Sequence, residues 1–515
     1  MRTTALALLA LSAVTLAEDD ARETARKLLA TTDDAERGRL LDALLALKPD
    51  PREVARWFAE GRAYAAEVPT GWLDLMVKGL DGKERPYLLH VPEGYTPEKR
   101  YGLLIDMHGG VSLPRPLGHR ELDQMKFFWG EAAVKDGWFL AIPSGEQGAE
   151  WWTTVGAGNI LSILDEARRT YNIDENRVFA TGFSDGGSGS FHLALVAPNR
   201  LAGIIPLNGH VAVAQAGGLQ VHLRTLVNVP IYAVNTENDR LYPPASMKPI
   251  IDALTGLGAP VTWRVIAEFG HDPSYVPGER PQILAWIAGT RRDPQPKRIV
   301  WEGTGSCRVR WLNVLDLGDA KDGADFPDVN PKLPPGRVRI GVVIDQAFEG
   351  EGVLVQEVQK DMPAGAIGIE PGDIIAGLDG APMRNMEELQ RALGGKKFGD
   401  AFRISIRRGE GTLEKEGRFP DASPQEAFRR EQPYGSIEAS ATDNLVDVRA
   451  RGIRAFDVYL SEPLFDLSKP ITVRVNGRTA YEGIVEPDLR FLAGQACADG
   501  DRTMVYLARL RINVP

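Results

Sequence analysis

This chain contains few cysteines, and its basic residues do not outnumber its acidic ones. Its 515 residues include two cysteines, and 60 Lys and Arg residues stand against 70 Asp and Glu residues, a formal net charge of −10 at pH 7. This acidic balance argues against nucleic acid as a main partner, because phosphate-binding surfaces are rich in positive charge. No apolar run reaches the roughly 18 residues that span a bilayer, so we expect no transmembrane segment.

Residues 1–17 have the pattern of a secretory signal peptide. Arg2 precedes an apolar core that runs from Ala5 to Leu16, and the small residue Ala17 stands at the expected cleavage point. The alternative interpretation is a buried N-terminal helix. We expect an exported protein, either secreted or periplasmic.

The remaining chain is long enough for several domains. Residues 18–66 carry leucines at spacings of three and four, which predicts a helical preface packed on the next domain. Residues 67–293 alternate between strand and helix patterns, which is typical of an α/β fold with a mostly parallel sheet and helices on both faces. Strands are predicted at 85–91, 101–107, 138–143, 177–181, 229–235 and 261–266.

The pattern changes after Pro294 and Pro296. Residues 299–333 and 430–515 alternate between apolar and polar positions, which predicts a β-sandwich-like domain in two parts. Its strands are predicted at 308–315, 445–450, 455–460, 471–475 and 504–512. The block between them, 334–418, differs in character and has proline-rich boundaries, so we expect an inserted module.

The two cysteines, Cys307 and Cys497, fall in the two parts of this β-domain. In an oxidising compartment they could pair, and a disulfide would then join the two parts across the insertion. The alternative is two separate buried thiols.

Ser184 lies in a Thr-Gly-Phe-Ser-Asp-Gly-Gly stretch that directly follows an apolar strand pattern. A strand that breaks into Gly-x-Ser-x-Gly and continues as a helix is a nucleophile elbow. Gly182 and Gly186 lack a Cβ, so the chain can turn sharply and expose the Ser184 hydroxyl. The alternative is a structural turn, because the pentapeptide alone also occurs by chance.

A nucleophilic serine needs a base and a group that orients the base. Asp239 follows the strand predicted at 229–235 and His271 follows the strand at 261–266. These are the positions expected for the acid and the base at the carboxyl ends of parallel strands. Glu237 is the alternative acid, and Asp272 is too close to His271 in sequence to orient its ring. The other candidate histidines have less suitable positions: His90, His119, His192, His210 and His222.

Acyl transfer also needs amides that bind an oxyanion. The strand at 101–107 ends in His108-Gly109-Gly110, whose glycines let bare backbone approach a substrate oxygen. The amide of Asp185 lies at a predicted helix N-terminus, which favours an anion. Gly109, Gly110 and Asp185 are therefore the expected oxyanion residues. We expect His108 to brace the loop and the Asp185 carboxylate to disfavour anionic acyl groups.

These motifs resemble the α/β-hydrolase superfamily, and most closely its secreted branch of polyester-depolymerase, feruloyl-esterase and prolyl-oligopeptidase-like proteins. The resemblance covers residues 72–288 and includes Trp151, Trp152 and the stretch 174–178. It implies hydrolysis of an ester, or less often of a peptide bond, through an acyl-enzyme and without a metal or other cofactor. Trp151 and Trp152 either line the substrate site or pack in the core.

The inserted block resembles a bacterial PDZ domain. Arg339, Ile340, Gly341 and Val342 match its carboxylate-binding loop, and the Glu-Pro-Gly-Asp-Ile-Ile stretch at 370–375 matches as well. Residues 386–393 would form the helix beside the peptide groove. The resemblance implies binding of a free C-terminal peptide, which adds a strand to a sheet edge. The alternative is a domain kept for its fold, without a peptide ligand.

The favoured interpretation is an exported serine hydrolase that cleaves carboxylic esters, with Ser184 as nucleophile, His271 as base and Asp239 as orienting acid. A prolyl-oligopeptidase-like peptidase is one alternative, although only a short helical segment stands where those enzymes carry a propeller. A non-catalytic scaffold on a hydrolase fold is the other, and the complete set of site residues argues against it.

Overall fold

The structure is a computed structural model that describes residues 18–336, 338–345 and 348–514. The chain divides into two compact units. One unit runs to Pro331 and resumes at Phe428, and the other comprises Lys332–Ala427. The predicted signal peptide, residues 1–17, lies outside the described residues. None of the described helices has the length and apolarity that crossing a membrane requires.

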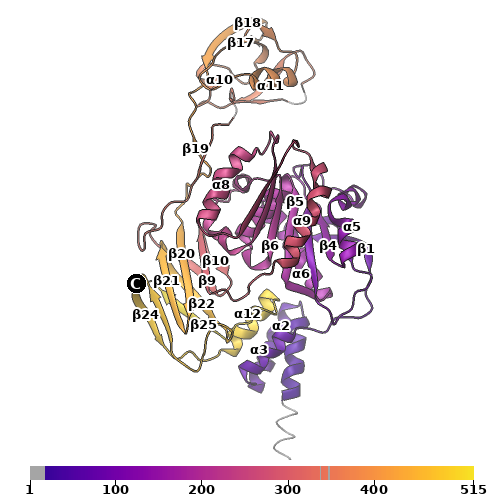
Figure 1. Ribbon diagram of the computed structural model, residues 1–515, viewed down its shortest axis with the longest axis vertical. Coiled ribbons are helices and arrows are strands. Elements are labelled where there is room, and N and C mark those ends of the chain that lie inside the picture. The colour runs from indigo at the N-terminus through magenta and orange to yellow at the C-terminus, as the bar shows by residue number, and fades with distance from the viewer. Residues whose placement is uncertain (1–17, 337, 346–347, 515) are drawn as a thin grey trace, which may run out of the picture. The chain divides into compact units, whose positions relative to one another are not determined.

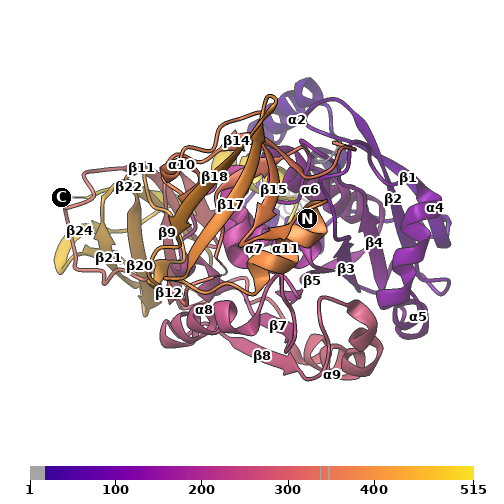
Figure 2. The ribbon, with the colours of Figure 1, turned by 90° about the horizontal axis from the view of Figure 1, so that it is seen from above.

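The first unit is organised around an eight-stranded sheet, shown in Figure 1. Its strands in chain order are β1 Gly71–Lys78, β2 Glu84–Val91, β3 Tyr101–Met107, β4 Phe139–Pro143, β5 Ile173–Phe183, β6 Gly203–Leu207, β7 Ile231–Thr236 and β8 Val261–Ile266. Across the sheet the order is β1-β2-β4-β3-β5-β6-β7-β8, which Figure 2 shows from above. Strand β2 runs antiparallel to β1 and β4, and every later pair is parallel. The carboxyl ends of β3 to β8 therefore share one edge.

This sheet confirms the expected α/β class. All six predicted strands are present, and the strands predicted at 101–107 and 261–266 have the same bounds as β3 and β8. The sequence pattern does not predict β1 or β6. Pro206 in β6 cannot donate a ladder hydrogen bond, so this segment is a poor match to a central strand. It nevertheless pairs with β5, with Pro206 opposite Gly182.

Helices cover both faces of the sheet. The main ones are α5 Lys126–Asp136, α6 Thr154–Thr170, α7 Asp185–Val196, α8 Pro244–Gly256 and α9 Val276–Gly289. On one face, Trp129 of α5 and Ile283 of α9 share a hydrophobic core with Leu104 of β3. On the other face, a Cβ added at Gly189 of α7 would lie 3.1 Å from the Met107 sulfur. Leu104 and Met107 point to opposite faces of β3 because side chains alternate along a strand.

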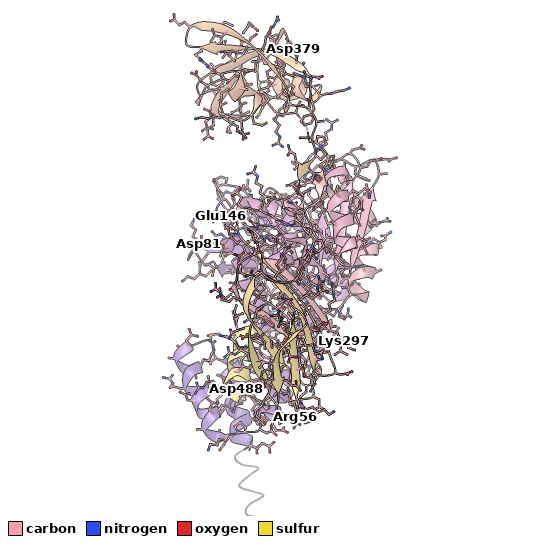
Figure 3. The ribbon with its side chains drawn as sticks, turned by 90° about the vertical axis from the view of Figure 1, so that its left-hand side faces the viewer. Arg56, Asp81, Glu146, Lys297, Asp379 and Asp488 are labelled. Carbon is pink, nitrogen blue, oxygen red and sulfur yellow. The ribbon has the colours of Figure 1, made fainter. Side chains whose placement is uncertain are left out.

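A buried arginine holds the loop after β4. Arg85 of β2 has 1% of its side chain exposed and pairs with Asp81 and Glu146, each at 2.8 Å. Asp81 and Glu146 lie near each other in Figure 3. A buried guanidinium is stable only when carboxylates compensate its charge, so Glu146 is fixed in place together with the loop that leads to Trp151.

The rest of the first unit contains a two-sheet β-domain. One sheet has the order β10 Cys307–Val309, β11 Leu312–Leu317, β22 Ile453–Leu460, β25 Ala508–Asn513, and the other has β24 Arg478–Gly483, β23 Ile471–Val475, β21 Leu445–Arg451, β20 Gly435–Thr442, β9 Arg298–Gly303. Val314 and Phe456 of the first sheet share a core with Val446 and Val473 of the second. The single strand predicted at 308–315 is instead a hairpin, because Arg310 has a φ of +52° and turns the chain between β10 and β11.

The N-terminal helices pack differently from the expectation. They comprise residues 18–30, α2 Asp34–Leu47 and α3 Pro51–Glu60. Leu28, Leu44 and Phe58 belong to the core of the β-domain, and Figure 1 shows α2 and α3 beside α12 (Leu489–Asp499). The leucine spacing predicts helices but does not specify which apolar surface they cover.

Two buried ion pairs join the α/β part to the β-domain. Arg292 donates to Asp501 at 2.7 and 3.1 Å, and Arg502 donates to Glu175 at 2.6 and 3.1 Å. None of these side chains is more than 7% exposed. Removing one partner would leave a buried charge uncompensated, so these parts form one unit.

The prediction of a disulfide between Cys307 and Cys497 is wrong. Cys307 and Cys497 are both free thiols. The Cys307 Sγ lies 3.8 Å from the Arg308 carbonyl oxygen, and the Cys497 Sγ lies 3.7 Å from the Leu28 carbonyl oxygen. Because Cys497 is on α12, its thiol takes part in the packing of the N-terminal helices instead.

The described residues of the second unit form a small β-structure with the helices α10 Pro363–Ala366 and α11 Met386–Gly394. Its sheet has the order β13 Val342–Ile344, β14 Val353–Val358, β15 Ile374–Leu378, β17 Ala401–Arg408, β18 Gly411–Arg418, and β16 Ala381–Pro382 pairs with β15. Helix α11, Met386–Gly394, lies where a helix is predicted, and its Leu389 joins the core of the unit. A short ladder of β12 Lys332–Leu333 with β19 Gln425–Glu426 closes the base.

Candidate active site

Ser184 stands at a sharp turn between β5 and α7. It has a φ of +60° and a ψ of −117°, a backbone conformation that costs a non-glycine residue free energy. The flanking glycines are required for packing: a Cβ would lie 2.3 Å from the Met107 oxygen at Gly182 and 1.8 Å from it at Gly186. The Gly-x-Ser-x-Gly spacing therefore lets the turn pack against the end of β3.

The structure brings His271 and Asp239 to this serine. The Ser184 Oγ lies 2.8 Å from His271 Nε2, and His271 Nδ1 lies 2.9 Å from Asp239 Oδ2. A carboxylate only accepts hydrogen bonds, so Nδ1 carries the imidazole proton and Nε2 accepts from the serine hydroxyl. The Asp239 carboxylate is fully buried, while 24% of the His271 side chain is exposed. The arrangement can move a proton away from Ser184.

The alternative acids are engaged elsewhere. The Glu237 carboxylate accepts the backbone N–H of Glu268 at 3.1 Å, and Asp272 accepts the backbone N–H of Ser274 at 2.7 Å.

Asp239 is held by four donors. Its Oδ1 accepts the backbone N–H groups of Leu241 and Tyr242 at 2.8 and 2.9 Å. Its Oδ2 accepts from His271 and from Asn208 Nδ2, the latter at 2.7 Å. Burial raises the pKa of Asp239, but the hydrogen bonds from His271, Asn208 and Tyr242 outweigh it and lower the pKa to about 2. Asn208 is a site residue that sequence reasoning missed, because it follows the unpredicted strand β6.

Of the expected oxyanion residues, Gly109 lies directly against the serine and Asp185 follows it in the chain. A Cβ at Gly109 would lie 3.1 Å from the Ser184 Cβ and 3.1 Å from the Phe183 oxygen, so an added side chain would press on the serine. Within the described part of the chain, the backbone N–H groups of Gly109, Gly110 and Asp185 have no acceptor. The Asp185 carboxylate accepts the backbone N–H of Val111 at 3.0 Å.

His108 connects the loop that carries Gly109 and Gly110 to the chain at Gly145. Its Nε2 accepts the backbone N–H of Gly145 at 3.0 Å, so its Nδ1 carries the proton and donates to the Gly109 oxygen at 2.9 Å. Burial lowers the pKa of His108, which keeps it neutral. Both ring nitrogens are occupied, as expected of a bracing residue.

The two tryptophans have different neighbours. Trp151 is fully buried, and its Nε1–H donates to the His108 oxygen at 2.8 Å. This places Trp151 in the core and corrects the idea that it lines the substrate site. Trp152 is 9% exposed and packs against Gly217, where a Cβ would lie 1.9 Å from the Trp152 carbonyl oxygen.

The other histidines have structural partners or are buried. His90 contacts the Trp138 oxygen at 2.9 Å and His119 contacts the Leu75 oxygen at 2.8 Å. His222 pairs with Glu302 of β9 at 3.0 Å. Burial lowers the pKa of His192 and of His210 to about 4.

The predicted carboxylate-binding loop of the second unit precedes an edge strand. Gly341 has a φ of +86°, and a Cβ there would lie 2.1 Å from the Met362 Cβ. Ile340 is buried, and its oxygen accepts the backbone N–H of Ala364 at 2.7 Å. Among the described strands, β13 pairs with β14 alone, so its other edge is open to an added strand.

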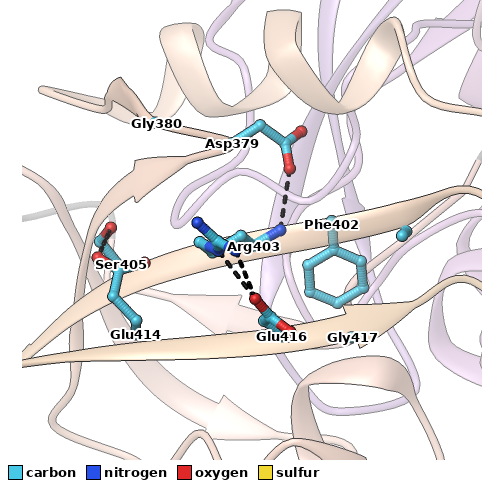
Figure 4. Close-up of a pocket in the computed structure, with 9 residues that line it drawn as sticks. Asp379, Gly380, Phe402, Arg403, Ser405, Glu414, Glu416 and Gly417 are labelled. Atoms are coloured by element: carbon cyan, nitrogen blue, oxygen red, sulfur yellow. Dashed lines mark hydrogen bonds and ion pairs between the residues drawn. The ribbon is translucent and has the colours of Figure 1, made fainter.

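A separate hollow of about 600 Å³ lies on β17 and β18, at the far side of this sheet from β13 (Figure 4). Arg403 crosses it and donates to Glu416 at 3.0 and 2.6 Å, and its backbone N–H donates to Asp379. These groups satisfy one another, so we assign no chemistry to the hollow. The described residues contain no cluster of His, Cys, Asp and Glu suited to a metal ion.

Comparisons with known proteins agree with the division of the chain into a hydrolase-like unit and a smaller inserted unit. The Phospholipase/Carboxylesterase family profile matches residues 156–276, a range that includes Ser184, Asp239 and His271. The PDZ domain profile matches residues 323–416.

Several of the similar proteins are esterases by name. The chain is 27% identical over 135 residues to a bifunctional acetylxylan esterase/xylanase of Neocallimastix patriciarum, covering 26% of this chain and 19% of that protein. It is 28% identical over 146 residues to feruloyl esterase C of Emericella nidulans, covering 28% of this chain and 52% of that protein. The chain thus spans about half or less of the length of these relatives. A crystal structure of a thermostable esterase covers 43% of this chain and 63% of its own, with 22% identity and a TM-score of 0.36.

Proposed function

We propose that this chain, which has an α/β-hydrolase-type sheet and matches the Phospholipase/Carboxylesterase and PDZ domain profiles, is a serine esterase with a peptide-binding module. The observation that carries the proposal is the continuous path from the Ser184 Oγ to His271 at 2.8 Å and from His271 to Asp239 at 2.9 Å. The bare backbone of Gly109 beside this serine supports it further.

The proposed reaction has two halves. The Ser184 Oγ attacks the ester carbonyl while His271 Nε2 takes its proton, and Asp239 stabilises the resulting imidazolium. The amides of Asp185 and of Gly109 or Gly110 bind the oxyanion. Its collapse expels the alcohol, which receives the proton from His271. Water then attacks the acyl-enzyme with His271 as base, releases the acid and restores Ser184.

Ester hydrolysis by matched serine variants tests the proposal. We expect wild type to hydrolyse 4-nitrophenyl acetate, and Ser184→Ala to lose turnover by several orders of magnitude with an unchanged fold. Ser190→Ala is the control, because this buried serine of the same helix donates to the Gly187 oxygen and should retain wild-type rates. Equal hydrolysis by Ser184→Ala and wild type would refute the proposal.

A substrate panel then defines the ester. The names of the relatives make feruloyl and acetylxylan esters the first polymers to test. Matched anilides belong in the same panel, and anilide cleavage faster than ester cleavage would favour a peptidase. No turnover of any substrate, with no acylation of Ser184, would favour a scaffold.

We also propose that the PDZ domain binds a free C-terminal peptide along β13. The open edge of β13 and the left-handed Gly341 before it support this role. Calorimetry with a peptide and its C-terminally amidated twin should show binding of the free acid alone. Equal affinity for both would contradict carboxylate recognition.

Export is proposed from the pattern of residues 1–17. N-terminal sequencing of the protein from an expressing bacterium should begin after Ala17, in the medium or the periplasm. An uncleaved, cytoplasmic chain would contradict it.

A further inference from the structure

Asn208 is a fully buried residue that connects the two loops of the proposed triad. It directly follows β6 and has a φ of +46°, a conformation that asparagine tolerates better than most residues. Its backbone N–H donates to the Val234 oxygen at 2.8 Å, which fixes it beside β7. The side chain therefore leaves the sheet at the edge where Asp239 and His271 also stand.

Both ends of the Asn208 amide are engaged, the nitrogen as a donor and the oxygen as an acceptor. Nδ2 donates to Asp239 Oδ2 at 2.7 Å and to Thr236 Oγ1 at 2.6 Å. Oδ1 accepts from the Tyr275 hydroxyl at 2.7 Å. The carboxylate can only accept, so it fixes which end of the amide faces it. The flipped amide would set two acceptors against each other.

These partners reach both sides of His271. The Thr236 hydroxyl donates to the oxygen of Gly270, the residue before His271, at 2.5 Å. Tyr275 lies four residues after His271 and is 4% exposed. Burial raises the pKa of Tyr275, so its hydroxyl keeps the proton that it donates to Asn208. Asn208 thus connects the Asp239 carboxylate with both ends of the loop that carries His271: with Gly270 through the Thr236 hydroxyl, and with Tyr275 directly.

We propose that Asn208 is a positioning residue: it aligns Asp239 with His271 and fixes the loop that carries the imidazole. The inference rests on the proposed function, because it acts through the roles assigned there to Asp239 and His271. The Asn208 amide does not touch the reacting atoms. Its effect is to keep one Asp239 oxygen in line with His271 Nδ1 while the two backbone amides hold the other oxygen.

Asn208→Asp is the sharpest test because it preserves the shape and tolerates the same backbone. Two adjacent buried carboxyl groups share one proton, and the protonated form can still donate to Asp239. As pH rises this shared proton is lost, the charges repel, and the alignment fails. We expect kcat/KM of Asn208→Asp to gain a falling alkaline limb that wild type lacks. KM at neutral pH should stay within about twofold.

Two further variants keep the test decisive if Asn208→Asp folds poorly. Tyr275→Phe removes one hydroxyl, and we expect kcat to fall by about three- to tenfold with KM unchanged. Asn199→Asp is the matched control, because this buried asparagine bonds to Arg308 and Arg310, away from the site. It should add no alkaline limb.

A second measurement separates this inference from the proposed function. The His271 Nδ1 proton, hydrogen-bonded to Asp239, should give a low-field proton NMR resonance in wild type, and it should shift in Asn208→Asp and in Tyr275→Phe. Loss of turnover by a constant factor at every pH, with an unmoved resonance, would overturn the positioning role. Absence of hydrolysis by wild type, with a resonance that still shifts, would refute the esterase and leave the alignment standing.

Discussion

The Asp185 carboxylate accepts the backbone N–H of Val111 at 3.0 Å, so the residue after Ser184 holds the loop that carries Gly109 and Gly110, the proposed oxyanion residues. The carboxylate therefore faces the protein rather than an incoming acyl group. This contact explains an acidic side chain beside Ser184 better than selection against anionic substrates does.

Asp185→Ala should loosen that loop and lower kcat on the order of 10-fold to 100-fold, because small misplacements of oxyanion donors are costly. Asp185→Asn retains an oxygen that can accept from Val111 and should stay within about threefold of wild type. Steady-state kinetics on a neutral ester measures both. An equal loss in Asp185→Asn and Asp185→Ala would show that the charge, and not the contact, matters.

Gly109 and Gly110 should respond differently to alanine. At Gly109 the new Cβ lies 3.1 Å from the Ser184 Cβ, so we expect kcat to fall by about 100-fold with little change in stability. At Gly110 the Cβ meets open space, but the φ of +61° is strained for alanine and should cost roughly 1–2 kcal/mol of unfolding free energy.

Urea unfolding and ester turnover of both variants test this contrast. Full activity in Gly109→Ala would contradict the placement of the oxyanion site.

The first two predictions involve residues that the sequence alone identifies, whereas Asn208 needed the structure. Ser184, Asp239 and His271 each follow an apolar run that predicts its strand. Asn208 follows β6, whose Pro206 cannot donate a ladder hydrogen bond and therefore makes the segment look unlike a central strand. The partners of Asn208 also come from distant loops, and no spacing rule relates them.

The fold shows the same division. Apolar alternation predicts β21, β22, β23 and β25 of the β-domain but misses β9, β20 and β24. A helical spacing of leucines predicts a helix but does not specify the surface that the helix covers. The N-terminal helices therefore lie on the β-domain core and not on the α/β sheet. Cys497 is part of that contact and is a free thiol.

Asp239→Asn should lower kcat by roughly 10⁴-fold, because an amide donates to His271 Nδ1 and places the imidazole proton on the nitrogen that faces Ser184. The pKa of Asp239 is lowered to about 2, so its carboxylate is charged at every pH above about 4. The stability that its hydrogen bonds contribute is present above the unfolded pKa and is lost as pH falls toward about 2.

The kcat/KM profile of wild type should therefore show no step from Asp239 between about pH 4 and pH 9. Turnover by Asp239→Asn at the wild-type rate would contradict the orienting role of Asp239 and would mean that another residue orients His271.

Deletion of Lys332–Ala427 should leave a working esterase. Asn330 and Phe428 exchange hydrogen bonds of 2.8 and 3.0 Å across the base of the insertion, so a short Gly-Ser bridge can close the chain. Every proposed catalytic residue lies in the other unit. We expect turnover of a small ester within about twofold of wild type and no binding of a C-terminal peptide.

Circular dichroism serves as the folding control for this deletion. A folded deletion variant without turnover would mean that the PDZ domain shapes the active site.

Site mapping with a fluorophosphonate probe tests the central claim most directly. After labelling of the native protein, digestion and mass spectrometry should find one phosphonyl adduct, on Ser184, and Ser184→Ala should remain unlabelled while Ser190→Ala labels fully. An adduct on another residue, or full labelling of Ser184→Ala, would contradict the account.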